Sequence, residues 1–151
     1  MLTAEAAFLT VGRTGIVMRT AGMDVPVRVE TDENGMPTDR VNDAGKNTSY
    51  HMLNEMPTFR FDLGALKGVR LQELRIVMDT YYANEVRAFA LNQGSGAWEE
   101  VAVNTGLEGP ERFLDGEGRL YLQFRQGGQG IYGDVPTPMI IVEGRQDNAE
   151  N

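Results

Sequence analysis

The segment RLYLQFR, residues 119–125, alternates strictly between apolar and polar side chains. Successive side chains of a β-strand point to opposite faces, so this pattern predicts a strand with Leu120, Leu122 and Phe124 facing inward. The outward face is expected to carry the remaining side chains, Tyr121, Gln123 and Arg125. Such a pattern restricts the chain to folds that are built on sheets.

Short extended segments recur along the chain, and 18 glycines and 6 prolines interrupt them, whereas helical periodicity is scarce. Within 71–80, Leu74, Ile76 and Met78 share one side. Residues 3–9 suit either a helical turn or an extended arm. The predicted strands are 15–20, 25–30, 58–63, 71–80, 85–92, 97–103, 119–125 and 139–144. About seven to nine short strands separated by turns predict an all-β fold, an antiparallel β-sandwich or jelly roll.

A chain of 151 residues, 41% of them hydrophobic, is expected to form one domain around one core. Residues 58–144 are predicted to hold the core sandwich, and 145–151 to form a polar tail. Residues 1–57 are predicted to supply an arm, the first strands and a long loop, which makes the N-terminal third loop-rich. That loop, 31–57, is rich in turn-forming residues, and loops of this length usually have a function or a partner.

The charge of the chain argues against nucleic acid as a partner. It carries 22 acidic and 14 basic side chains, a net charge of -8, and it has no run of basic residues that could follow a phosphate backbone. The arginines are spread singly and are expected to lie on a solvated face. The acidic balance favours a partner surface that is neutral or basic.

The chain has no cysteine, which excludes disulfides, thiolate metal sites and a cysteine nucleophile. Its first residues lack the basic start of a secretory signal and include Glu5, and no apolar run approaches the roughly 20 residues that span a bilayer. If Met1 is the native start, we expect a protein made in the cytosol without a signal peptide and without membrane insertion, which could be incorporated in a virion. If it is not, a secreted protein is the alternative.

Three segments in order carry a resemblance to a known superfamily. They are FRFDLGALKGVRLQELRIVMD, EVRAFALNQGSGAWEEVAV, and GEGRLYLQFRQ followed by PMIIVEG. This order of strands, with a glycine-containing hairpin that ends in Trp98, resembles the galactose-binding-domain-like β-sandwiches, jelly rolls found in carbohydrate-binding modules and discoidin-type domains. The resemblance covers residues 58–144 and implies a fold rather than a catalytic activity.

Trp98 is the only tryptophan, and its position after QGSG has two interpretations. An exposed indole could stack on a sugar ring, whereas an indole at the start of the second hairpin strand would pack on the sandwich. The resemblance favours the structural interpretation. We therefore predict that Trp98, Phe61 and Phe124 stabilise the fold, and that ligand-binding residues lie in the loops.

The acidic segment TDENGMPTDRVND offers Asp32, Asn34 and Asp39 as oxygen ligands for calcium. Their spacing does not match a calcium-binding EF-hand loop, so ordinary turn formation is the alternative. The resemblance implies a structural calcium near the first strands, because many of the similar domains hold one. Calcium is the only cofactor that the sequence suggests.

Three tyrosines are the predicted ligand-binding residues. Tyr132 lies in the glycine-rich segment 126–138, and Tyr81 and Tyr82 follow a predicted strand. They could form an aromatic rim at one end of the sandwich, or they could pack as ordinary edge residues. His51, the sole histidine, is expected to be a solvent-facing or hydrogen-bonded loop residue, since no nucleophile elbow accompanies it.

These features predict a protein without catalytic activity. The first hypothesis is a surface or assembly module that binds other protein subunits, as a structural component of a bacteriophage virion such as a head-decoration, tail or adhesin subunit. The alternative is a carbohydrate-binding module of a larger secreted enzyme, with a glycan as its ligand. A hydrolase ranks last, because adjacent Glu99 and Glu100 would point to opposite faces of a strand.

Overall fold

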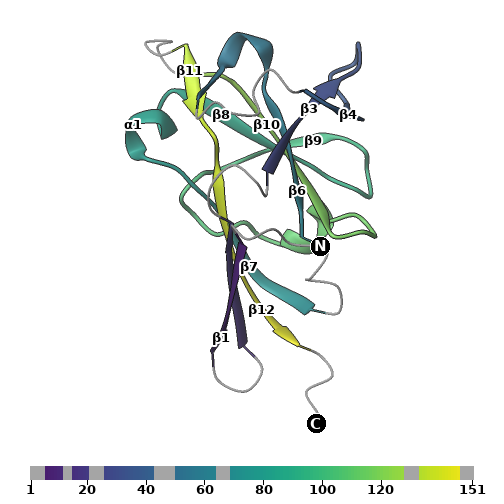
Figure 1. The fold of residues 1–151 in the computed structure, drawn as a ribbon, viewed down its shortest axis with the longest axis vertical. Coiled ribbons are helices and arrows are strands. Elements are labelled where there is room, and N and C mark those ends of the chain that lie inside the picture. The colour runs from purple at the N-terminus through teal and green to yellow at the C-terminus, as the bar shows by residue number, and fades with distance from the viewer. Residues whose placement is uncertain are drawn as a thin grey trace.

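The computed structural model describes residues 6–11, 15–20, 26–42, 50–63, 69–127 and 133–146. The strands among these residues form three antiparallel sheets (Figure 1). The four-stranded sheet has the order β1 (Ala6–Val11), β2 (Gly15–Thr20), β12 (Met139–Gln146) and β7 (Val69–Val77). The six-stranded sheet has the order β4 (Pro37–Val41), β3 (Pro26–Thr31), β6 (Thr58–Asp62), β10 (Arg119–Gln126), β8 (Val86–Leu91) and β9 (Trp98–Val101).

A two-stranded sheet and short helices complete the fold. The small sheet pairs β5 (Tyr50–Met52) with β11 (Asp134–Pro136). The helical elements are the 3-10 turns η2 (Leu53–Glu55) and η4 (Pro110–Phe113) and the one-turn helix α1 (Thr80–Ala83). The all-β antiparallel sandwich predicted from the sequence is confirmed, and the predicted loop of 31–57 contains two short strands and a 3-10 turn.

One hydrophobic core joins the two larger sheets. Strand β10 lies in the middle of the six-stranded sheet and places Leu120, Leu122 and Phe124 in this core, all fully buried. Strands β7 and β12 of the four-stranded sheet face them with apolar side chains that belong to the same cluster, Leu71, Leu74, Ile76, Ile140 and Val142. The inward alternation predicted for 119–125 and 71–80 is therefore confirmed.

The outward face predicted for 119–125 is observed, but two of its residues are not exposed to solvent. Tyr121 is only 8% exposed and Gln123 is fully buried. The turn between β3 and β4 folds over this outer face, and the carbonyl oxygen of Gly35 accepts a hydrogen bond from Nε2 of Gln123 at 3.2 Å. Gly35 has a φ of +81°, a conformation that glycine adopts without strain. A strand pattern alone does not reveal that a distant turn covers its polar face.

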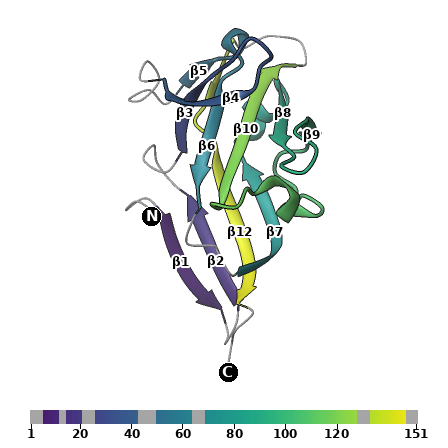
Figure 2. The ribbon, with the colours of Figure 1, turned by 90° about the vertical axis from the view of Figure 1, so that its right-hand side faces the viewer.

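The β1–β2 hairpin extends beyond the six-stranded sheet. Both ribbon views show it at the end of the molecule opposite β5 and β11 (Figures 1 and 2). β2 pairs with β12, and β1 pairs with β2 in six consecutive residue pairs. Of the two structures that suit residues 3–9, the extended one is therefore observed over Ala6–Val11.

Candidate functional site

The predicted tyrosines Tyr81 and Tyr82 lie on the one-turn helix α1. Asp79 precedes this helix, and its Oδ1 accepts a hydrogen bond from the backbone N–H of Tyr81 at 2.9 Å, which caps the helix start. The rings of Tyr81 and Tyr82 meet edge to face, with centroids 5.5 Å apart and planes at 85°. Tyr81 is 57% exposed.

A third tyrosine, which sequence reasoning missed, joins them from β5. The ring of Tyr50 lies 5.9 Å from that of Tyr82, and Tyr50 is 46% exposed. Met52 follows on the same outward side of β5, with 53% exposure. We call Tyr50, Met52, Tyr81 and Tyr82 the tyrosine patch. The local sequence around Tyr50 carries no strand pattern, so only the pairing of β5 with β11 brings Tyr50 into this position.

The hydroxyl group of Tyr82 is held in its protonated form by its neighbours. A side-chain hydrogen bond with Tyr50 raises the pKa of Tyr82 to about 12, and burial and the nearby carboxylate of Asp134 act in the same direction. Asp134 stands opposite Met52 in the β5–β11 pairing and so lies beside the patch. Tyr82 therefore stays protonated at neutral pH and can donate and accept hydrogen bonds.

The patch rests on elements that are anchored in the core. Leu53 directly follows β5, and Val135 lies in β11; both are buried members of the hydrophobic core. The backbone N–H of Leu53 donates to the carbonyl of Gly133 at 2.8 Å, which extends the pairing of the two strands. The exposed side chains are thus presented from a fixed backbone, a condition that favours binding because little ordering is required.

His51 is buried behind the patch and holds β5 in place. Its ring meets Phe59 edge to face, with centroids 4.7 Å apart. Arg28 can only donate, so Nδ1 of His51 accepts from Nη1 of Arg28 at 3.5 Å, and Nε2 donates to Oγ1 of Thr137 at 2.8 Å. Burial, and then the positive charge of Arg28, lower the pKa of His51 to about 4. The imidazole is therefore neutral at pH 7 and has a structural role.

Two of the three residues predicted as calcium ligands, Asp32 and Asn34, lie in one turn. Oδ1 of Asp32 accepts hydrogen bonds from the backbone N–H groups of Asn34 and Met36, at 2.8 and 3.0 Å. Asp39 is exposed on β4. Within the described part of the chain, no three His, Cys, Asp or Glu side chains form a group suited to a metal ion. The carboxylate of Asp32 is used by the turn itself, the behaviour expected of an Asx turn.

Trp98 holds the turn that covers the outer sheet face. Its Nε1 donates to the carbonyl of Gly35 at 3.0 Å, and the same carbonyl accepts from Gln123. Trp98 stands opposite Leu91 in the β8–β9 hairpin, whose Gly96 takes a φ of +74°. Phe61 and Phe124 are fully buried in the core. Tyr132 lies outside the described residues.

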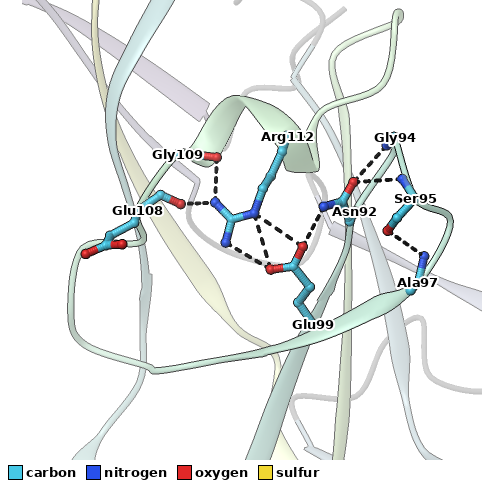
Figure 3. A network of polar contacts seen from close by, with 8 residues as sticks. All are labelled: Asn92, Gly94, Ser95, Ala97, Glu99, Glu108, Gly109 and Arg112. Carbon is cyan, nitrogen blue, oxygen red and sulfur yellow. Dashed lines mark hydrogen bonds and ion pairs between the residues drawn. The ribbon is translucent and has the colours of Figure 1, made fainter.

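A polar network stabilises the same hairpin at the turn that leads into β9 (Figure 3). Arg112 of η4 donates from Nη2 and Nε to the carboxylate of Glu99, at 3.0 to 3.3 Å, and from Nη1 to the carbonyls of Glu108 and Gly109. Asn92 donates to the same carboxylate, and these bonds lower the pKa of Glu99. Glu99 is thus committed to a structural ion pair.

No family model matches this chain, and neither a curated protein nor a solved structure matches it. The resemblance to the galactose-binding-domain-like sandwiches therefore stays a prediction from the sequence. Among the described residues, no helix has the length and apolar character needed to cross a membrane. The tyrosine patch is the feature of these residues that most resembles a binding site.

Proposed function

We propose that this chain is a non-catalytic β-sandwich module that binds another protein through the tyrosine patch, as one subunit of a larger assembly. The observation that carries the proposal is the exposure of Tyr50, Tyr81 and Met52 together, at 46, 57 and 53%. They lie on β5, which leads into the buried Leu53, and on α1, whose Tyr82 packs against the core. Exposed apolar side chains that are grouped and rigidly held are typical of interaction sites.

The composition of the patch favours a protein partner. Tyrosine and methionine are enriched at the centres of protein interfaces, and tyrosine is frequent among the residues that dominate binding energy. The ring planes meet at 48° and 85°, so the rings do not form one flat platform. A sugar ring stacks best on a single open face, whereas the side chains of a protein partner can pack against rings in several orientations.

The partner surface is proposed to be neutral or basic. The chain carries a net charge of -8, and Asp134 adds a carboxylate beside the patch. Complementary charge accelerates association and makes it sensitive to salt. Association with a basic partner should weaken as salt concentration rises.

Within this class we propose a structural component of a bacteriophage virion, such as a head-decoration, tail or adhesin subunit. A small cysteine-free sandwich with a rigid exposed patch suits docking on a larger particle. The second candidate is a carbohydrate-binding module, and the observation that favours it is the exposed ring of Tyr81 at one end of the sandwich.

The test compares the wild-type chain with Tyr50→Ser/Tyr81→Ser, and uses Val41→Ser as a control, since Val41 is an exposed apolar residue on a different element, β4. The wild type and the control should sediment with particles from the source, and the double variant should bind at least about tenfold more weakly. A wild-type chain that is recovered only as a free monomer, never with particles, contradicts the virion proposal. Glycan-array binding that is lost with Tyr81→Ser would favour the second candidate.

A further inference from the structure

The two larger sheets have four edge strands, and the chain protects three of them. The edges are β1 and β7 in the four-stranded sheet, and β4 and β9 in the six-stranded sheet. An edge strand presents backbone N–H and C=O groups that can pair with another strand. An edge strand that is neither covered nor protected by its sequence is therefore the place where a strand of another chain can pair.

The edge of β7 is covered by the chain itself. The backbone N–H of Asn104 donates to the carbonyl of Ile76 at 2.7 Å, and that of Leu107 donates to the carbonyl of Leu74 at 2.9 Å. Between them, Gly106 forms a bridge with Arg75. The segment 104–107 thus occupies the place of a neighbouring strand.

The edges β4 and β9 are protected by their sequences. β4 begins with Pro37, carries Asp39 and Arg40, and pairs with β3 in an irregular register. β9 has only four residues, two of which are Glu99 and Glu100. Proline, charge, irregularity and short length are the usual means by which proteins discourage pairing at an edge.

β1 has none of these protections. Its sequence, AAFLTV, contains no charged residue, no proline and no glycine. It pairs with β2 in six consecutive residue pairs without a bulge, and it pairs with no other described strand. The hairpin also extends beyond the six-stranded sheet (Figure 2), so the described strands of that sheet do not cover it along its whole length.

We infer that β1 pairs antiparallel with β1 of a second copy of this chain, which joins two four-stranded sheets into one continuous sheet across a two-fold axis. A two-fold contact uses the same strand on both sides, and antiparallel pairing of a strand with itself satisfies that symmetry. Each copy carries a net charge of -8, but β1 is uncharged, so the contact places no like charges opposite each other within the strand pair. This surface is separate from the tyrosine patch, and the inference does not rest on the proposed function.

The test is self-association of the full chain, measured by sedimentation velocity over a range of concentrations. The wild type should show a monomer–dimer equilibrium. In a pairing centred on Phe8, Ala6 of one copy lies opposite Thr10 of the other. The variants Ala6→Lys/Thr10→Lys and Ala6→Glu/Thr10→Glu should each dimerise at least roughly tenfold more weakly, because like charges then face each other across the strand pair. An equimolar mixture of the two variants should restore the dimer.

Two controls separate this inference from its alternatives. Val41→Lys adds a charge at the β4 edge, and Tyr50→Ser/Tyr81→Ser alters the tyrosine patch; both should dimerise as the wild type does. A wild-type chain that remains monomeric at all concentrations overturns the inference, as does a dimer that the β1 variants leave unchanged or that the patch variant abolishes.

Hydrogen exchange of the wild type keeps the test decisive if the β1 variants fail to fold. Backbone amides in residues 6–11 should exchange more slowly as protein concentration rises, because the dimer protects alternate N–H groups along the strand. Amides of β4 should show no such dependence. Equal exchange of residues 6–11 at low and high concentration would contradict the proposed pairing.

Discussion

The two faces of the six-stranded sheet are buried by different means. The inner face packs against the four-stranded sheet through side chains that are almost entirely apolar, such as Phe61, Leu122 and Phe124. The outer face carries Val29, Phe89, Leu91 and Tyr121, all at most 8% exposed, yet none of them belongs to the core cluster. A single turn and several polar side chains cover them. The buried side chains of the described residues therefore form two layers, an apolar core between the sheets and a second layer under a polar cover.

Replacing one phenylalanine on each face should give the largest difference in unfolding free energy. Phe124 is fully buried between the sheets, so Phe124→Ala should lower the free energy of unfolding by about 3–5 kcal/mol. Phe89 is covered by the guanidinium groups of Arg125 and Arg87, which lie 3.9 and 5.2 Å from its ring centre. This cover is polar rather than a second apolar sheet, so Phe89→Ala should cost less, about 1–2 kcal/mol. Urea unfolding measures both, and equal losses would contradict the distinction.

Near β3, the inner face of the six-stranded sheet carries polar groups, so the free energy of unfolding should depend on pH. His51 has a pKa of about 4 in the folded chain, below its ordinary value of 6.5, so the unfolded chain binds more protons between these values. Stability should fall as pH decreases from 6.5 to about 4, by at most about 3 kcal/mol from this residue.

The control for this pH dependence is His51→Gln, which retains an amide donor and an acceptor but does not titrate. The difference in unfolding free energy between the wild type and this variant should change across that pH window and stay constant above it. A constant difference from pH 4 to 7 would show that protonation of His51 does not oppose folding.

The smallest expected effect concerns the turn over the outer face. Trp98→Phe removes one of the two hydrogen bonds to the carbonyl of Gly35 and should cost about 1 kcal/mol. Gln123→Leu removes the other, together with the bond to Thr58. The double variant should lose more than the sum of the single variants, because the carbonyl then has neither donor. Thermal unfolding followed by circular dichroism provides the comparison, and strict additivity would argue against a shared acceptor.

The sequence predicted the inner layer well because alternation reports directly on a face that meets another sheet. Leu120, Leu122, Phe124, Leu74, Ile76 and Met78 are all buried as expected. The outer layer could not be predicted, since Tyr121 and Gln123 look like solvent-facing residues until the turn at Gly35 folds over them. Val29 of β3 also belongs to this layer: it pairs with Thr58 on the outer face and is 3% exposed there.

The candidate site was only partly accessible to sequence reasoning. Tyr81 and Tyr82 stand out as an aromatic pair after a strand, and the structure places both at one end of the sandwich. Tyr50 and Met52 lie in a segment that reads as a loop, because three-residue strands such as β5 carry too little pattern to be recognised. Their position depends on pairing with β11, more than 80 residues later in the chain.

Because Trp98 donates a hydrogen bond to Gly35, tryptophan fluorescence can follow the outer layer. Trp98 is the only tryptophan in the chain, so its fluorescence reports whether the turn between β3 and β4 is in place, rather than whether the inner core is intact. Unfolding curves recorded by fluorescence and by circular dichroism will coincide only if the two layers separate together. An earlier fluorescence transition would reveal a state in which the sandwich persists while its outer cover has already opened.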